Sequence, residues 1–187
     1  MTSPRFFVVL NPAAGRGAAA RAEGAIRAAV ARAGGEVRVA LTTRRGHAAE
    51  LAEEAARGGW PVVVAVGGDG TVHECANGVL DSGTSAALGV LPAGNGNDFA
   101  LIAGIPSGLD AALGHLLASR PRAVDTGRVA GRWFVNGVGV GLDARVAIEA
   151  NRSRRLRGVT NKTMNKEPKW RHNRGELTTG YEPRWGN

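Results

Sequence analysis

Three glycines and one carboxylate stand together in the middle of the chain, as Gly67-Gly68-Asp69-Gly70. They follow a short apolar run and precede a stretch with helical periodicity, which predicts a turn from the end of a strand onto a helix. Such a turn favours phosphate, because glycines let backbone N–H groups approach closely and the helix dipole attracts an anion. Asp69 would repel a phosphate unless a cation lay between them or the carboxylate took a proton. The turn therefore indicates a metal–nucleotide site, and the alternative is an ordinary tight turn with Asp69 in solvent.

Two more loops of small and polar residues follow other predicted strands. Residues 11–17, NPAAGRG, follow the first strand, and Arg16 could add positive charge for a phosphate. Residues 92–99, PAGNGNDF, follow the fourth strand, and Asn97 or Asp98 could cap a short helix after them. In an open α/β sheet, ligands bind outside the carboxyl ends of the strands. Three such loops at one edge indicate a ligand site more strongly than any one of them.

Hydrophobic periodicity predicts the elements that hold these loops. The central strand, residues 62–66, has β-branched side chains at four of five positions and no polar face, which is typical of a parallel strand buried on both sides. The predicted fold class is α/β, a parallel sheet with helices on both faces. Further strands are predicted at residues 5–10, 36–41 and 86–91, and helices at residues 18–33, 48–57, 71–80 and 109–119.

The helix after the glycine turn is predicted to begin at a capping box formed by Thr71 and Glu74. Its apolar stripe should face the core, while His73, Glu74 and Asn77 face outward. The stripe includes Cys75, the only cysteine, which we interpret as a packing residue.

From about residue 122 the pattern changes to alternation with period two, and Ala130-Gly131 is predicted as a hairpin turn. Antiparallel β structure is expected from there. The expected domains are therefore a nucleotide-binding domain at residues 1–125, the incomplete start of a β-rich domain at residues 126–150 and a basic, poorly ordered tail at residues 151–187. An unpaired strand edge within residues 126–150 would favour a homodimer.

The net charge of +8 is concentrated in the tail. Residues 1–150 hold 14 Arg, no Lys and 13 acidic residues, whereas residues 151–187 hold 7 Arg, 3 Lys and 3 Glu. Because no lysine precedes Lys162, the body of the chain can form neither a Walker A loop nor a protein-kinase site. The four histidines show no metal-ligand spacing and Cys75 has no neighbouring base, which argues against zinc and thiol chemistry.

Taken together, residues 11–17 (NPAAGRG), 67–80 (GGDGTVHECANGVL) and 91–100 (LPAGNGNDFA) resemble the catalytic domain of the diacylglycerol kinase and lipid kinase family. This family includes the sphingosine kinases and is distantly related to the NAD kinases and phosphofructokinases. The likeness covers about residues 5–150. It implies an ATP- and Mg²⁺-dependent kinase that phosphorylates a lipid hydroxyl in phospholipid biosynthesis. It also implies a Rossmann-like nucleotide domain followed by a β-sandwich, with the active site between them.

The resemblance implies roles for particular residues. Asp69 is the expected catalytic residue, acting through metal and water or as a base, and Asp69 and Asp125 are the expected metal ligands. The chain departs from the family pattern at Asn95, where Thr or Ser is frequent, at His73, where Asn is common, and at Leu101, where an Arg often stands. The residues expected to bind nucleotide are Asn11, Pro12, Ala13, Ala14, Gly15, Thr42, Gly67, Gly68, Asp69, Gly70, Thr71, Val72, His73, Gly94, Asn95, Asn97 and Asp98.

Residues 151–187 do not resemble the remainder of a β-sandwich, so three hypotheses stay open. The first is a working lipid kinase that acts on a lipid alcohol at a membrane surface, without a nucleic-acid partner. The second is a catalytically silent nucleotide-binding fragment. The third is a binder of anionic membranes or nucleic acid through the tail, with Trp170 and Trp185 as stacking or interfacial groups.

The N-terminus lacks the features of a signal peptide, and no apolar run reaches the roughly 18–20 residues of a membrane span. A cytoplasmic protein is therefore expected, associated peripherally with the inner membrane face if its substrate is a lipid.

Overall fold

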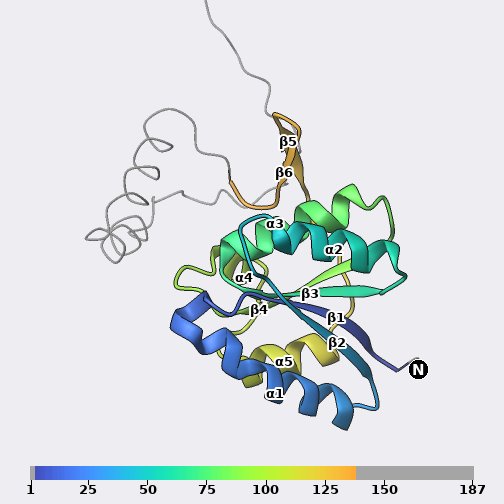
Figure 1. Cartoon of the computed structure of the whole chain (residues 1–187), viewed down its shortest axis with the longest axis vertical. Helices are drawn as coiled ribbons and strands as arrows, with labels where there is room; N and C mark the ends of the chain where they lie inside the picture. The colour runs from blue at the N-terminus through green and yellow to red at the C-terminus, as the bar shows by residue number, and fades with distance from the viewer. Residues whose placement is uncertain (1–2, 138–187) are drawn as a thin grey trace, which may run out of the picture. The chain divides into compact units, whose positions relative to one another are not determined.

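Four parallel strands lie at the centre of the fold, in the order β2–β1–β3–β4 (Figure 1). They are β1 (Arg5–Leu10), β2 (Glu36–Leu41), β3 (Val62–Gly67) and β4 (Ala87–Pro92). The register places Val64 of β3 beside Val8 of β1 on one side and Gly89 of β4 on the other. The computed structural model describes residues 3–137.

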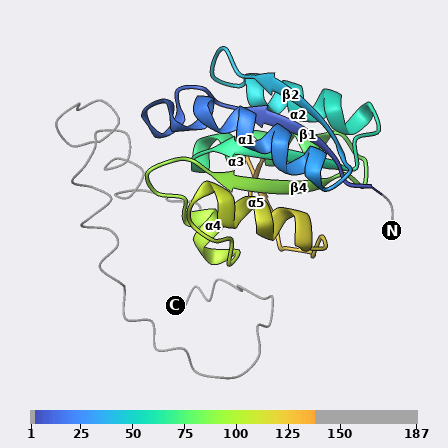
Figure 2. The same cartoon turned by 90° about the horizontal axis from the view of Figure 1, so that it is seen from below.

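Helices cover both faces of this sheet. On one face lie α1 (Ala18–Arg32) and α5 (Leu109–Ala118), side by side (Figure 2). On the other face lie α2 (His47–Arg57) and α3 (Asp69–Asp81), which pack closely against each other. The predicted α/β class with a parallel sheet is therefore confirmed.

The core has two parts because strand side chains alternate between faces. Phe6, Val8 and Leu10 of β1 pack towards α1 and α5, while Phe7 and Val9 pack towards α2 and α3. Much of the helical contribution comes from alanine, which lets the helices lie close to the sheet.

The predicted start of α3 at Thr71 and the predicted capping box are both wrong. The helix begins at Asp69, with Gly68 as its N-cap, and no capping box forms. Thr71 Oγ1 instead accepts a hydrogen bond from Asn11 Nδ2 at 3.2 Å, and Glu74 Oε2 accepts one from the Ala48 N–H at 3.3 Å. Both side chains found partners on other elements, so they were not available to cap their own helix.

Asn77 was also expected to face outward, and it is buried, with 9% of its surface exposed. Its carboxamide is covered by the β-hairpin that follows α5, an element from a distant part of the chain. That hairpin consists of β5 (Gly127–Val129) and β6 (Arg132–Phe134). The predicted turn at Ala130-Gly131 is confirmed, since both residues have positive φ, as a two-residue type I′ turn requires.

Two short helices complete the described part, a 3₁₀ helix η1 (Ala14–Gly17) and α4 (Asp98–Ile102). No helix within residues 3–137 is long and apolar enough to cross a membrane. The rest of the expected β-rich domain, residues 138–150, and the basic tail, residues 151–187, lie outside the described residues. The expected division into domains stays a prediction.

Candidate functional site

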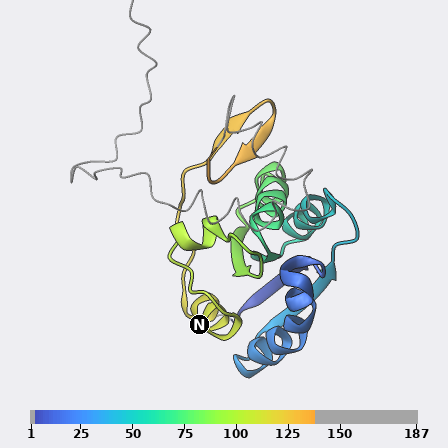
Figure 3. The ribbon, with the colours of Figure 1, turned by 90° about the vertical axis from the view of Figure 1, so that its left-hand side faces the viewer.

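The three loops singled out from the sequence meet at one edge of the sheet, where the parallel strands end (Figure 3). Strand pairing continues into the loops. The Asn11 N–H donates to the Val66 carbonyl at 3.0 Å, and the Ala93 N–H donates to the Gly67 carbonyl at 2.8 Å. The sheet thus fixes the start of each loop relative to its neighbour.

Asn11 ties the first loop to the start of α3. Its Nδ2 donates to Thr71 Oγ1, and its Oδ1 accepts a hydrogen bond from the Ala13 N–H at 3.1 Å. The same side chain therefore shapes its own loop and holds Thr71 in the first turn of the helix. Pro12 and Ala14 are half-buried in this loop, and Ala13 is exposed.

The backbones of the second and third loops touch at Gly68 and Gly94. A Cβ at Gly68 would lie 3.2 Å from Gly94 Cα, and a Cβ at Gly94 would collide with Gly68 Cα and lie 2.9 Å from Asn97 Oδ1. The first loop approaches in the same way, because a Cβ at Gly15 would collide with the Ala93 carbonyl. Only glycine allows these approaches. Gly15, Gly68 and Gly94 thus bring the three loops together beside the amino end of α3, in an arrangement that we call the glycine cradle.

Two carboxylates flank Gly96 next to this cradle. The position of a Gly96 Cβ lies 3.0 Å from Asp69 Oδ2 and 3.7 Å from Asp98 Oδ1. Asp69 is the first residue of α3, and its Oδ1 accepts a hydrogen bond from the Phe99 N–H at 3.1 Å. One oxygen of Asp69 is thus held by the backbone of α4, and the other points towards the third loop.

The third loop is stiffened from within by Asn97. Its Oδ1 accepts from the Gly94 N–H and its Nδ2 donates to the Gly94 carbonyl, both at 2.9 Å. Asn97 occupies the N-cap position of α4 with φ of 57°, and its side chain makes no capping bond. The hypothesis that Asn97 caps this helix through its side chain is therefore wrong, because both polar atoms are engaged with Gly94. Asn95 is exposed at the tip.

The remaining residues expected to bind nucleotide lie at different depths. Thr42 directly follows β2, and its N–H donates to the Leu10 carbonyl at 2.9 Å. His73 is half-buried one turn into α3, and Gly70 is exposed. Val72 is 3% exposed and packs in the core, so its side chain takes no part in this surface.

The loop that follows Thr42 is held by its own polar contacts. The Thr43 N–H donates to His47 Nδ1 at 3.1 Å, and Arg44 donates to Glu50 at 2.6 Å. This hydrogen bond raises the pKa of Arg44 and lowers the pKa of Glu50. Both side chains are more than half exposed, so the ion pair orders the loop more than it stabilises the fold.

The two carboxylates beside Gly96 suit Mg²⁺, which proteins commonly bind through one or two carboxylates while substrate phosphates and water complete its shell. Asp125, the other expected metal ligand, lies in the exposed stretch between α5 and β5. Within residues 3–137, no group of three or more acidic, His or Cys side chains could hold a metal by itself. The donor set therefore fits a metal that arrives together with phosphate.

Residues 5–129 match the family model described as the diacylglycerol kinase catalytic domain, which is more than half of the chain. The chain belongs to this family. Its curated relatives carry names of lipid kinases. One named probable lipid kinase YegS-like, from Pseudomonas syringae pv. syringae, is 42% identical over 119 residues, which are 64% of this chain and 38% of that protein. Another of that name, from Enterobacter sp. (strain 638), is 38% identical over 112 residues, which are 58% of this chain and 38% of the relative.

A solved structure of a diacylglycerol kinase from Bacillus anthracis str. Sterne has the same fold, with a TM-score of 0.64 at 28% identity. The superposition covers 72% of this chain and 48% of that one. This diacylglycerol kinase catalytic domain thus corresponds to 38% of the length of its curated relatives and about half of the solved structure.

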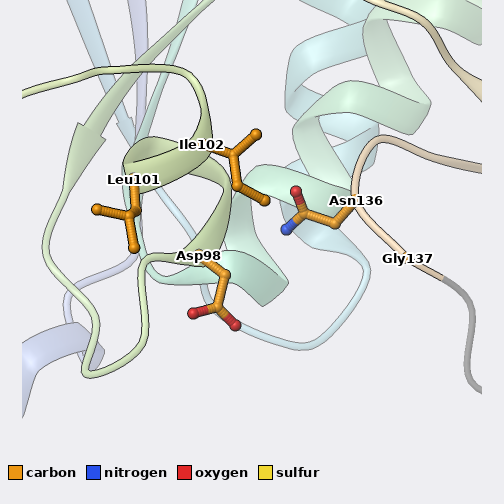
Figure 4. A pocket seen from close by; sticks show the side chains of 5 residues that line it. All are labelled: Asp98, Leu101, Ile102, Asn136 and Gly137. Carbon is orange, nitrogen blue, oxygen red and sulfur yellow. The ribbon is translucent and has the colours of Figure 1, made fainter. Parts of the chain in front are cut away.

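Sequence reasoning missed a hollow of about 490 Å³ beside Asp98. It is lined by Asp98, Leu101 and Ile102 of α4 and by Asn136 and Gly137, which follow β6 (Figure 4). Leu101 and Ile102 are 76% and 77% exposed. The only signal in the sequence was the run of four apolar residues at 99–102, FALI, because a helix this short cannot bury apolar side chains on all of its faces. Sequence reasoning also missed the contact between Asn77 and the hairpin, which no local pattern reveals.

Proposed function

We propose that this diacylglycerol kinase catalytic domain binds Mg-ATP and supplies the nucleotide site for transfer of the γ-phosphate to the hydroxyl of a lipid alcohol. The observation that carries the proposal is the pair of carboxylates, Asp69 and Asp98, placed around Gly96 at the amino end of α3. A glycine cradle and two carboxylates together suit a metal-bound polyphosphate, whereas either alone would suit many ligands.

The phosphates would lie against the first turn of α3 and the contact between Gly68 and Gly94. Backbone N–H groups at a helix start are free to donate, and the helix dipole adds positive potential. Gly15 brings the first loop to the same place, where the exposed Arg16 could reach a phosphate. Adenosine would lie nearer Thr42, the first residue after β2.

Asp69 and Asp98 would hold the Mg²⁺, and Asp125 is proposed as an outer member of the same network. A bound Mg²⁺ supplies charge neutralisation for the phosphate oxygens during transfer. The Phe99 N–H orients Asp69 through Oδ1 and leaves Oδ2 to contact the metal shell or to accept a proton. The carboxylate is thereby placed before substrate arrives, which lowers the cost of ordering it.

The acceptor is proposed to be a lipid alcohol presented at a membrane surface, with the protein cytoplasmic and peripheral at the inner face. The support is the names of the relatives, which are lipid kinases and diacylglycerol kinases. The homodimer expected through residues 126–150 is kept as a proposal, and a monodisperse monomer by light scattering across a concentration range would contradict it.

The test is transfer of labelled γ-phosphate from Mg-ATP to a panel of lipid alcohols in mixed micelles, using the 187-residue chain. Asp69→Asn is the control variant. It keeps an oxygen for the Phe99 N–H and removes the negative charge, so the fold should persist while Mg-ATP engagement or transfer falls. Unchanged ATP binding and turnover in Asp69→Asn would refute the assignment of Asp69.

A second candidate is a nucleotide-binding fragment without transfer activity. It is favoured by one observation, that the chain corresponds to 38% of the length of its curated relatives. Mg-ATP binding measured by calorimetry, with no transfer of phosphate to any lipid of the panel, would select this candidate over a working kinase.

A further inference from the structure

The buried carboxamide of Asn77 pairs with a β-strand from another part of the chain. Its Oδ1 accepts a hydrogen bond from the Trp133 N–H, and its Nδ2 donates to the Trp133 carbonyl, each at 3.0 Å. Nδ2 also donates to the His73 carbonyl within α3, at 2.8 Å. Asn77 therefore satisfies both backbone groups of Trp133, as a neighbouring strand would.

These two backbone groups would otherwise form an open strand edge. Trp133 pairs with Arg128, one position away from the Val129–Arg132 pair that closes the two-residue turn. In antiparallel ladders hydrogen-bonded and non-bonded pairs alternate, so the N–H and C=O of Trp133 point away from β5. A two-stranded hairpin is marginal by itself, and an unpaired edge makes it more so.

The Trp133 side chain strengthens the same attachment. Its Nε1–H donates to Asp81 Oδ1 at 2.9 Å, and the Arg128 guanidinium lies 5.0 Å from the centre of its ring. Asp81 is the last residue of α3 and stands one helical turn beyond Asn77. The hairpin is thus fixed to the carboxyl-terminal half of α3 through one residue.

The same helix holds the proposed site at its other end. Asn77 and Asp81 stand about two and three turns beyond Asp69 on α3. The eight residues from Asp69 to Asn77 span about 12 Å of helix. One rigid element therefore sets both the Asp69 carboxylate and the hairpin.

The position of the hairpin determines where Asn136 and Gly137 lie relative to Asp98. Residues Asn136 and Gly137 leave β6 and line the hollow opposite α4, with the Asn136 side chain directed towards Ile102 (Figure 4). Arg122, in the stretch before β5, donates to the Ala103 carbonyl at the end of α4. The stretch before the hairpin is tied to the end of α4 by this contact, and β6 is tied to α3 by Asn77, so both contacts bear on how Asn136 and Gly137 lie relative to Asp98.

We propose that Asn77 is a positioning residue, which docks β6 on α3 and thereby holds Asn136 and Gly137 opposite Asp98 for phosphoryl transfer. The transfer part of this inference rests on the proposed lipid kinase function, and the docking part does not. A residue with this role should affect the transfer step and leave nucleotide affinity alone, because its contacts lie two turns away from the glycine cradle.

The test compares the parent chain with Asn77→Ala and with a matched control, Ser82→Ala. Ser82 also bonds a carbonyl of α3, that of Val79, and its other side-chain hydrogen bonds are to Thr84 rather than to the hairpin. Amide hydrogen exchange at Trp133 and in β3 is measured, together with kcat and the KM for ATP. For Asn77→Ala we expect exchange at Trp133 about tenfold faster or more, which corresponds to loss of at least one hydrogen bond. We expect unchanged exchange in β3, kcat lower by about 10- to 100-fold, and KM for ATP within about twofold of the parent.

Three results would overturn the proposal: unchanged exchange at Trp133, faster exchange with unchanged kcat, or a rise in KM that matches the fall in kcat. If Asn77→Ala also exposes β3 to exchange, the similarly sized Asn77→Leu carries the test with the same criteria, since it fills the space of the carboxamide and removes both of its hydrogen bonds to Trp133. If the parent chain transfers no phosphate, the proposed function fails, and exchange at Trp133 alone still decides whether Asn77 docks the hairpin.

Discussion

Replacing Gly94 by alanine should weaken Mg-ATP binding without unfolding the protein. The added Cβ would collide with Gly68 Cα, and it would also lie 2.9 Å from Asn97 Oδ1 and 3.2 Å from Gly68 N. Two of these neighbours are backbone atoms of the second loop, which cannot rotate away as the end of a flexible side chain can. The third and second loops must therefore move apart, and the cradle beside Asp69 opens.

The cost of this movement can be estimated from similar overpacked sites. Inserting one methyl group into a tightly packed site costs about 1–3 kcal/mol. If the free protein relieves the strain by opening the loops, the loops must close again when nucleotide binds. Binding then becomes weaker by the strain energy, and the Kd for Mg-ATP rises about 5- to 150-fold. The sheet and its four covering helices lie outside these loops, so the unfolding transition should remain cooperative.

Isothermal titration calorimetry with Mg-ATP and thermal unfolding measure the two quantities. The matched control is Gly24→Ala, in the exposed middle of α1, where a Cβ meets nothing within 4 Å. This substitution should stabilise the protein by about 0.5–1 kcal/mol and leave the Kd unchanged. Binding by Gly94→Ala that equals the parent would refute the reasoning, as would loss of a cooperative transition in Gly94→Ala, which would show that the contact supports the fold.

Three further predictions concern packing and the tail. Gly78→Ala should destabilise the fold by about 1–3 kcal/mol in urea unfolding, because its Cβ would collide with the Ala49 carbonyl where α2 and α3 cross; a stability equal to the parent would contradict this close approach. Burial raises the pKa of the Cys75 thiol, so it stays protonated and should not react with a thiol reagent until denaturant is added; rapid labelling of the native protein would be the contrary result. Removal of residues 151–187 should abolish salt-sensitive binding to anionic vesicles or nucleic acid if the basic tail carries it, and unchanged binding after truncation would eliminate that hypothesis.

The sequence by itself determined the local elements and the loops that join them. The strand predicted at residues 36–41 has those bounds in the structure, and the turn at Ala130-Gly131 lies where it was expected. These features depend on hydrophobic periodicity and on the backbone conformations open to each residue, and residues close together in the sequence determine both. The three glycine loops were likewise identified with their residues, and the general rule for parallel sheets predicted that they would meet at one edge.

Only the tertiary structure decided which partners the polar side chains take. Thr71 and Glu74 have the spacing of a capping box, yet they bond Asn11 and the Ala48 N–H, and Asn77 is buried against Trp133, 56 residues away. The contact between Gly68 and Gly94 also depends on β3 and β4 being neighbours in the sheet. A hydroxyl, carboxylate or carboxamide can bond any suitable group within about 3 Å, and chain folding, rather than sequence spacing, determines which groups come within that reach.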